Sequence, residues 1–388
     1  MDKIKIVHIP DLHVGHAKVP PDLLYQHVQK YIYPTLEDTN LVIFNGDFFD
    51  TLLNFNHQQG AVADRIIHEV IEMAITHKFF IRVNRGTFYH DRKQNQFFVL
   101  GMEQVSDNYQ LDGEDLIKVY DSVGLEVINY LGISLLYLPD DLPYDNKLTV
   151  GKELMKQAHL DKVDFIINHG YFEHMLPKGM PEMPHGTISE KEVRSVVKGV
   201  VLNGHVHTPS IYHKVISGGS FERLAFGEEE DKGFFVLTYE PKSGKLTHKF
   251  IINEDALKFT TIDITGLTDE QARAKVVPVV DNLDRTRADI TIPIHVRILG
   301  EDSVINHSVV DYIKCKYQKI YPTIKSNSSV NEIVVNTTTV TQDLPVVTEQ
   351  SLPGLISNFC NQGTTKITDA EIMEVLNATA SATTDSSR

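Results

Sequence analysis

The strongest constraint on the fold is a series of short apolar runs, separated by segments of helical or loop character. Each run is rich in Val, Ile, Leu or Phe and too short for a buried helix, so we interpret it as a strand that is buried on both faces. Two intervening segments, Tyr25–Leu36 and Gly60–Thr76, carry helical spacing instead. This alternation predicts a layered α/β architecture. The predicted strands are Ile4–Ile9, Leu41–Asn45, Phe79–Val83, Ile133–Leu138, Val163–Asn168 and Val200–Leu202.

Residues with metal-binding or acid–base chemistry directly follow five of these strands. Because the carboxyl ends of strands form the ligand crevice in open α/β sheets, we expect the side chains to meet in one pocket. Taken singly, each motif has an ordinary interpretation as a turn, a helix cap or a loop with exposed histidines. Taken together, two carboxylates and four histidines fit a pair of metal ions bridged by one carboxylate, for which Asp47 is the candidate. The six are Asp11, His13, Asp47, His169, His205 and His207.

The order of these motifs resembles that of the calcineurin-like metallophosphoesterase superfamily, whose blocks are D-x-H, G-D-x-x-D, G-N-H-D/E, a single His and G-H-x-H. The resemblance implies a four-layer α/β/β/α sandwich and a dinuclear site. One ion would be held by Asp11, His13, Asp47 and His207, and the other by Asp47, His169 and His205. Asp50, the second acid of G-D-x-x-D, would support the ligands without binding an ion.

The third block departs from the superfamily pattern. It reads Gly86-Thr87-Phe88-Tyr89-His90-Asp91, with two residues inserted and without the usual metal-binding Asn. Asn84, Thr87 or a water are the alternatives for that ligand position. By the resemblance, His90 is the catalytic histidine and Asp91 the carboxylate that orients it.

A further stretch narrows the resemblance. Ile216–Arg223, Phe226-Gly227-Glu228 and Asp231–Phe234 are similar to a signature of the SbcD-type nuclease subunits of DNA repair and recombination complexes, including phage relatives. The alternative is an ordinary Gly-rich turn before a hairpin. The family implies a manganese-dependent exonuclease or endonuclease that cleaves double-stranded DNA ends, pairs as a homodimer and works with an SbcC-type ABC ATPase.

Changes in residue composition and pattern along the chain predict three parts. They are a nuclease domain over 1–255, a small α+β capping and DNA-binding domain over 259–326, and a linker with a helical tail over 327–388. In the second part we expect strands at Thr261–Ile264 and Ile292–Leu299. Helices are expected from a capping box at Thr268 and Gln271 to Val280, and over Val309–Lys316. A hairpin is predicted earlier, with strands Phe234–Glu240 and Lys245–Ile252.

The tail contains one apolar stripe at helical spacing. A short helix cannot bury such a stripe by itself, so it suits either a groove on the ATPase partner or packing onto the protein's own second domain. The stripe consists of Leu352, Leu355, Ile356 and Phe359.

Composition limits the remaining possibilities. The 52 acidic and 37 basic residues give a net charge of −15, which argues against a generally basic nucleic-acid binder but leaves room for a local basic groove. Two cysteines, Cys315 and Cys360, fit a reducing cytosol. The chain starts in a strand-like run and has no apolar stretch near the roughly 18 residues of a membrane span. We therefore expect a cytoplasmic protein without a signal peptide or a membrane partner.

Two rival functions remain open at this point. One is a phosphomonoesterase or cyclic-nucleotide phosphodiesterase on the same scaffold, because fold does not determine substrate. The other is a non-catalytic scaffold for DNA ends whose metal site has decayed at the third block. Metal content and activity on small phosphate esters would distinguish them.

Overall fold

The computed structural model describes residues 2–105, 110–140, 144–176, 187–286 and 292–326. All of them belong to the first of two compact units, Met1–Ile333, and the second unit, Val334–Arg388, lies outside the described residues. The predicted stripe of Leu352, Leu355, Ile356 and Phe359 therefore also lies outside them. Among the described helices, none combines the length and the apolar character that crossing a bilayer requires.

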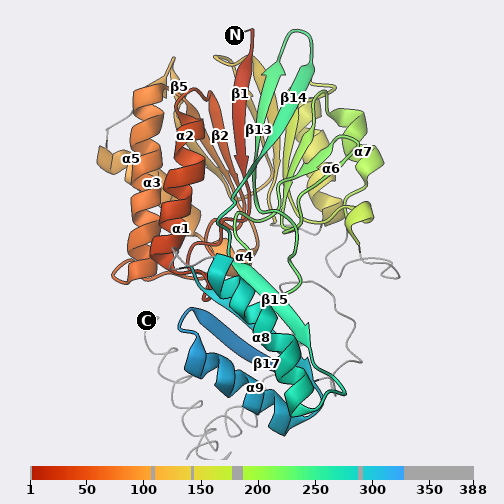
Figure 1. Ribbon diagram of the computed structural model, residues 1–388. Helices are drawn as coiled ribbons and strands as arrows, with labels where there is room; N and C mark the ends of the chain where they lie inside the picture. Colours follow the sequence, from red (N-terminus) through yellow and green to blue (C-terminus); the bar gives the residue numbers. More distant parts are fainter. Residues whose placement is uncertain (1, 106–109, 141–143, 177–186, 287–291, 327–388) are drawn as a thin grey trace, which may run out of the picture. The chain divides into compact units, whose positions relative to one another are not determined.

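Two six-stranded mixed sheets form the larger part of this unit (Figure 1). Each has four neighbouring parallel strands, with an antiparallel hairpin on one side in the first sheet and one antiparallel strand at each edge in the second. In the first sheet the order is β14 (Lys245–Ile252), β13 (Gly233–Glu240), β1 (Ile4–Ile9), β2 (Leu41–Asn45), β3 (Phe80–Asn84), β6 (Ile117–Tyr120). In the second it is β11 (Ser210–Tyr212), β12 (Val215–Ser217), β10 (Val201–Gly204), β9 (Phe165–His169), β8 (Ile133–Leu138), β7 (Gly124–Ile128).

Apolar side chains lie on both faces of each sheet. One core joins the first sheet to the helices α1 (Pro21–His27), α3 (Gln58–His77) and α5 (Phe97–Val105). A second core lies between the sheets, where Ile6 and Phe80 of the first pack with Phe165 and Leu202 of the second. A third joins the second sheet to α6 (Tyr144–Gln157) and α7 (Glu190–Val196). The α/β class predicted from the sequence is confirmed.

The predicted strands agree closely with those observed. Ile4–Ile9, Leu41–Asn45 and Ile133–Leu138 have the predicted bounds, and β2 and β8 are buried at every position. The predicted helix Tyr25–Leu36 is interrupted by a π-helical turn, Val28–Ile32, before α2 (Tyr33–Leu36). Pro34 has no backbone N–H to continue the regular hydrogen bonds, so the turn widens just before it.

Residues Lys258–Ser326 form a three-stranded sheet with its own core. Its strands β15 (Lys258–Asp263), β16 (Ile294–Gly300) and β17 (Ile320–Ser326) are parallel, and α8 (Asp269–Thr286) and α9 (Ser303–Lys316) connect them. The predicted α+β class of this part is therefore wrong, because strands and helices alternate.

Strand β17 was not predicted because Pro322 lies in its middle. A proline cannot donate to a ladder, but it is tolerated at an edge, which is where β17 lies. The predicted capping box is confirmed by two hydrogen bonds. The Thr268 N–H donates to Gln271 Oε1 at 3.1 Å, and the Gln271 N–H donates to Thr268 Oγ1 at 3.3 Å. The predicted boundaries at 255, 259 and 326 stay predictions.

Candidate metal centre

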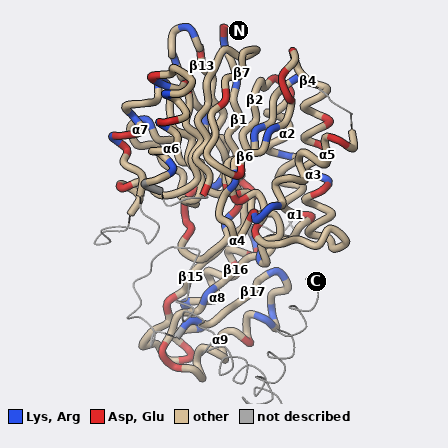
Figure 2. Tube along the Cα trace, turned by 180° about the vertical axis from the view of Figure 1, so that it is seen from behind, with Lys and Arg blue, Asp and Glu red and all other residues tan. Residues whose placement is uncertain are grey.

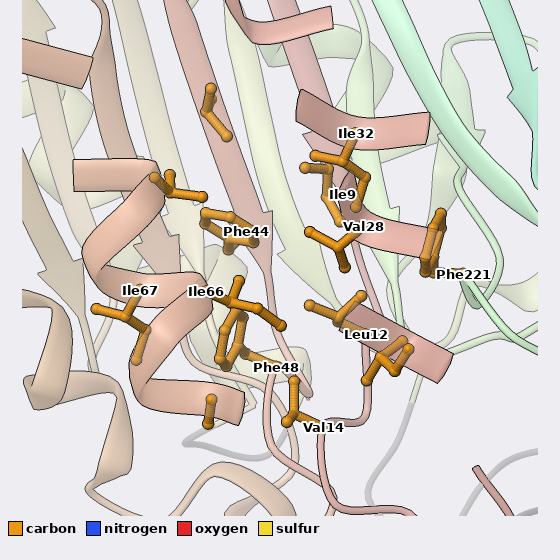
Figure 3. Packing of buried hydrophobic residues seen from close by; sticks show 14 of the residues in the cluster. Ile9, Leu12, Val14, Val28, Ile32, Phe44, Phe48, Ile66, Ile67 and Phe221 are labelled. Carbon is orange, nitrogen blue, oxygen red and sulfur yellow. The ribbon is translucent and has the colours of Figure 1, made fainter. Parts of the chain in front are cut away.

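The predicted ligands come from the carboxyl ends of parallel strands in both sheets. Asp11 and His13 follow β1, Asp47 follows β2, His169 ends β9, and His205 follows β10. Apolar neighbours anchor these loops, since Leu12, Val14 and Phe48 alternate with the polar residues and are buried in the first core. Figure 3 shows the three side chains packed in that core beside Ile9 and Phe44.

The backbone at four of these residues is unusual. Asp11, His13, Asp47 and His205 all have positive φ, with values of 50°, 50°, 49° and 82°. Non-glycine residues rarely adopt this region, and those that do so concentrate at functional sites, where the surrounding structure holds the strain.

A first group consists of Asp11, His13 and His207, whose ligand atoms lie within 4.8 Å of one another. The two Nε2 atoms of His13 and His207 are 3.1 Å apart. Asp11 Oδ1 is 4.0 Å from the former and 3.9 Å from the latter. Both Asp11 oxygens also accept the backbone N–H of His205 at 3.0 Å, which holds the carboxylate in place.

A second group consists of Asp47, His169 and His205, also with ligand atoms within 4.8 Å. Asp47 Oδ2 is 3.3 Å from His169 Nε2 and 3.9 Å from His13 Nε2, which belongs to the first group. This one carboxylate therefore faces both groups.

Three imidazoles are oriented through the nitrogen that faces away from the centre. His169 Nδ1 donates to the carbonyl oxygen of Asn45 at 2.9 Å, and His13 Nδ1 to Asp50 Oδ1 at 2.9 Å. His207 Nδ1 donates to Glu228 Oε1 at 3.3 Å. Metal-binding histidines are typically held in this way, which leaves Nε2 for the ion.

His169 gives the sharpest sign of a missing ligand. Its Nε2 is buried and makes no regular hydrogen bond to the residues that the structure describes, although the Asp47 carboxylate lies 3.3 Å away. Buried polar atoms are rarely left unpaired, and an absent ion is one of the recognised reasons. The donors around it are imidazole nitrogens and carboxylate oxygens, the ligands that zinc and manganese accept. These residues could hold a metal ion.

The electrostatics agree with a site for cations. Burial by itself would lower the pKa of His13, but the hydrogen bond to Asp50 and the charges of Asp47 and Asp11 raise it to about 9. Burial would also lower the pKa of His169, but the Asp47 carboxylate raises it to about 10. For Asp47 burial favours the neutral form, yet the surrounding imidazoles hold its pKa below the ordinary value. The carboxylates thus attract positive charge to the place where the Nε2 atoms converge.

The third block contributes Thr87 to the second group. Its N–H donates to Asp47 Oδ1 at 2.6 Å, and its hydroxyl lies 3.2 Å from Asp47 Oδ2 and 3.4 Å from His205 Nδ1. Asn84, the other protein candidate for the missing ligand, is buried and donates to Asn45 Oδ1 at 2.9 Å. Of these two residues, Thr87 is the one that contacts the second group.

His90 lies beside the first group, with its ring edge-on to that of His13 at 5.0 Å. Its Nδ1 hydrogen-bonds the carbonyl oxygen of Asp50. The ligand atoms of His13, Asp50 and His90 lie within 4.8 Å of one another, so Asp50 is adjacent to the centre as expected.

The hydrogen bonds of Asp91 differ from the predicted pairing with His90. Its oxygens accept the backbone N–H groups of Gly86 (2.7 Å), Asp47 (3.0 Å) and Phe49 (3.1 Å), and the amide of Asn95 (3.0 Å). This fully buried carboxylate positions the loop that carries Asp47, while the Asp50 carbonyl orients His90. Burial, together with the nearby Asp47, raises the pKa of Asp91 to about 6.

Sequence reasoning missed the roles of three residues. Glu228 and Lys232 belong to the motifs that carried the family resemblance, but no role had been assigned to them. Lys232 Nζ lies 2.7 Å from Glu228 Oε2 and donates to the carbonyl oxygen of His207 at 2.8 Å, so the pair supports His207 from two sides. Lys147 of α6 is buried and donates to the carbonyl oxygen of His169 at 2.7 Å. No sequence signal pointed to Lys147.

Comparison with known proteins adds little to this geometry. No family model matches the chain, and no curated protein does. Among solved structures 32 chains match, and one crystal structure is 12% identical, covers 64% of this chain and 99% of that chain, and has a TM-score of 0.34. A likeness at that TM-score carries no argument, so the candidate function depends on the residues of the centre.

Proposed function

We propose that this protein is a two-metal phosphodiesterase that cleaves DNA, with the four-layer sandwich of the metallophosphoesterases and the role of an SbcD-type nuclease subunit. One observation carries the proposal: Asp47 faces both groups of ligands, at 3.3 Å from His169 Nε2 and 3.9 Å from His13 Nε2. A shared carboxylate is what two neighbouring cations require, because it offsets their mutual repulsion.

Two divalent cations, when bound, neutralise the non-bridging oxygens of a phosphodiester and lower the pKa of water. Asp11, His13 and His207 would hold one of them, and His169 and His205 the other, with Asp47 between them and Thr87 beside the second. We assign proton transfer to His90. Its Nδ1 is engaged by the Asp50 carbonyl, which leaves Nε2 to donate a proton to the leaving oxygen.

Manganese, double-stranded DNA ends, an SbcC-type ATPase and a homodimer are proposed as the cofactor and the partners. They follow from the resemblance of the motifs. Support comes from Glu228 and Lys232, because the residues of the narrower signature contact His207 directly. Figure 2 shows basic residues interspersed with acidic ones along α6 and α7.

The test is manganese-dependent cleavage of a linear DNA duplex by wild type, Asp47→Asn and His90→Ala. We expect Asp47→Asn to lose metal and activity together. His90→Ala should retain two ions and lose about 10²- to 10⁴-fold in kcat, the usual contribution of a general acid. Bound metal is measured by elemental analysis after gel filtration.

Matched controls are Asp161→Asn and His77→Ala, two exposed residues outside the centre. Both should behave as wild type. Equal cleavage by all five proteins would refute the mechanism. Hydrolysis of small phosphate esters without DNA cleavage would replace the nuclease with a phosphatase.

A further inference from the structure

Two exposed aromatic side chains stand next to the candidate metal centre. They are the residues that lengthen the third block, Phe88 and Tyr89, and their side chains are 55% and 67% exposed. The rings contact each other edge-to-face at 5.8 Å. Neighbouring large apolar rings on a surface usually indicate a binding function.

The backbone that carries the two rings is tied to the ligand loops. They lie on α4 (Phe88–Asp91), whose ends are tied to the ligand loops: Thr87 bonds to Asp47, and Asp91 accepts three backbone N–H groups from the same region. His90, between Tyr89 and Asp91, reaches the first group. Phe88 and Tyr89 therefore belong to the short segment between Thr87, which contacts the second group, and His90, which lies beside the first.

The surroundings favour a nucleotide as the occupant. Arg92 and Lys93 follow closely in the chain and are exposed, so this segment carries positive charge that suits a phosphate backbone. Adjacent aromatic rings and cationic side chains together make a stacking platform for bases. A base in a duplex already stacks on its neighbours and shows only its edges, whereas an unpaired base offers its face.

We propose that Phe88 and Tyr89 stack on unpaired bases beside the scissile phosphate, and that they make the enzyme prefer strand ends that are frayed or single-stranded. This inference rests on the proposed nuclease function and names the form of DNA that the site takes. Loss of stacking on one base by alanine substitution typically weakens binding about 5- to 150-fold.

The experiment compares two single-stranded DNA oligonucleotides, one normal and one with abasic sites flanking the cleaved position. Wild type, Tyr89→Ala, Phe88→Ala and Tyr89→Phe are assayed for kcat/KM with manganese and, without turnover, for binding by fluorescence anisotropy. We expect Tyr89→Ala and Phe88→Ala to lose at least about 5-fold on the normal strand and little on the abasic one. Tyr89→Phe keeps the ring and should retain the wild-type kcat/KM and affinity. The control Tyr212→Ala, at an exposed tyrosine of the edge strand β11, should retain them too.

Equal losses on both oligonucleotides, or no loss on either, would overturn the stacking inference while leaving the nuclease intact. Absence of cleavage by wild type would overturn the proposed function instead. In that case the difference between normal and abasic strands in the binding measurement still decides whether the rings stack. Metal content and thermal unfolding of each variant exclude a folding defect, and Tyr89→Ala carries the test if Phe88→Ala is unstable.

Discussion

The individual residues of the centre are held by partners on their far sides. His207 illustrates this, because Glu228 accepts a hydrogen bond from its Nδ1 and Lys232 contacts both the Glu228 carboxylate and the His207 carbonyl oxygen. Burial alone would raise the pKa of Glu228, but the hydrogen bond with His207 and the charge of Lys232 lower it to about 2. Glu228 is therefore an anion at neutral pH, and it selects the His207 tautomer that offers Nε2 to an ion.

Removing this support should weaken metal binding without removing a ligand. We expect Glu228→Ala to lower manganese affinity about 10- to 100-fold, as measured by isothermal titration calorimetry. Glu229→Ala, the exposed neighbour, is the control. An unchanged affinity in Glu228→Ala would show that His207 needs no such partner.

His8 makes stability depend on pH. It is fully buried, Asn45 donates an amide proton to its Nε2 at 3.0 Å, and burial lowers its pKa to about 3. The unfolded chain has the ordinary value near 6.5 and binds a proton first, so the contribution is complete above pH 6.5 and is lost as the pH falls. We expect His8 to account for about 2 kcal/mol of lost stability between pH 7.5 and pH 5.

The measurement is urea unfolding at both pH values for wild type and His8→Gln. The substitution removes the titrating group and keeps an acceptor for Asn45. Its stability should fall by about 2 kcal/mol less over this range. An equal fall in the two proteins would contradict the assignment.

At the scale of elements, the turns after the strands decide the geometry of the centre. Gly46, between β2 and Asp47, has a φ of 79°, and a Cβ atom there would lie 2.0 Å from His169 Nδ1. The turn and the imidazole from the other sheet therefore share a space that only glycine leaves open.

Gly46→Ala should displace His169 as well as strain the turn. We expect a stability loss of about 3 kcal/mol or more and at least about 10-fold weaker metal binding. The control is Gly244→Ala in the β13–β14 turn, where φ is 70° and a Cβ meets nothing within 4 Å. It should lose only about 1–2 kcal/mol, from the positive φ, and no metal affinity. Thermal unfolding and metal titration of both variants would check this, and similar behaviour of the two would contradict it.

At the scale of the whole described unit, asparagines connect the two sheets beneath the centre. The side-chain nitrogen of Asn45 lies 3.0 Å from the carbonyl oxygens of Asn168 and Leu202 in the other sheet. Asn84 donates to Asn45, and Asn168 donates to Asn203 at 2.6 Å. The positions of the two groups of ligands thus depend on how the sheets are joined at this edge.

Asn45→Ala should remove the amide group that the buried carbonyl oxygens of Asn168 and Leu202 and the Nε2 atom of His8 share. We expect a loss of about 2–4 kcal/mol in the free energy of unfolding, measured in urea. Asn129→Ala, an exposed asparagine at the end of β7, should lose much less. A loss below 1 kcal/mol for Asn45→Ala would mean that the sheets are joined by apolar packing alone.

The sequence by itself determined the strands and the identity of the ligand candidates. Runs such as Leu41–Asn45 are buried on both faces, so almost every residue of the run has to be apolar, and this makes the strand visible in the sequence. The motifs also followed from local order, because Asp11, Asp47 and His205 each come directly after a strand. Strand β17 was not predicted because Pro322 disfavours a strand in the local sequence. The proline is tolerated because β17 lies at the edge of its sheet.

Only the tertiary structure decided which groups hydrogen-bond to the side chains of the centre and orient them. Asp91 is adjacent to His90 in the chain, yet its oxygens turn to the loop of Asp47, while a backbone carbonyl serves His90. Lys147 and Glu228 reach His169 and His207 from separate segments, 22 and 21 positions away in the chain. Hydrogen-bond partners depend on distances of a few tenths of an ångström between separately folded segments, and no local pattern of residues encodes those distances.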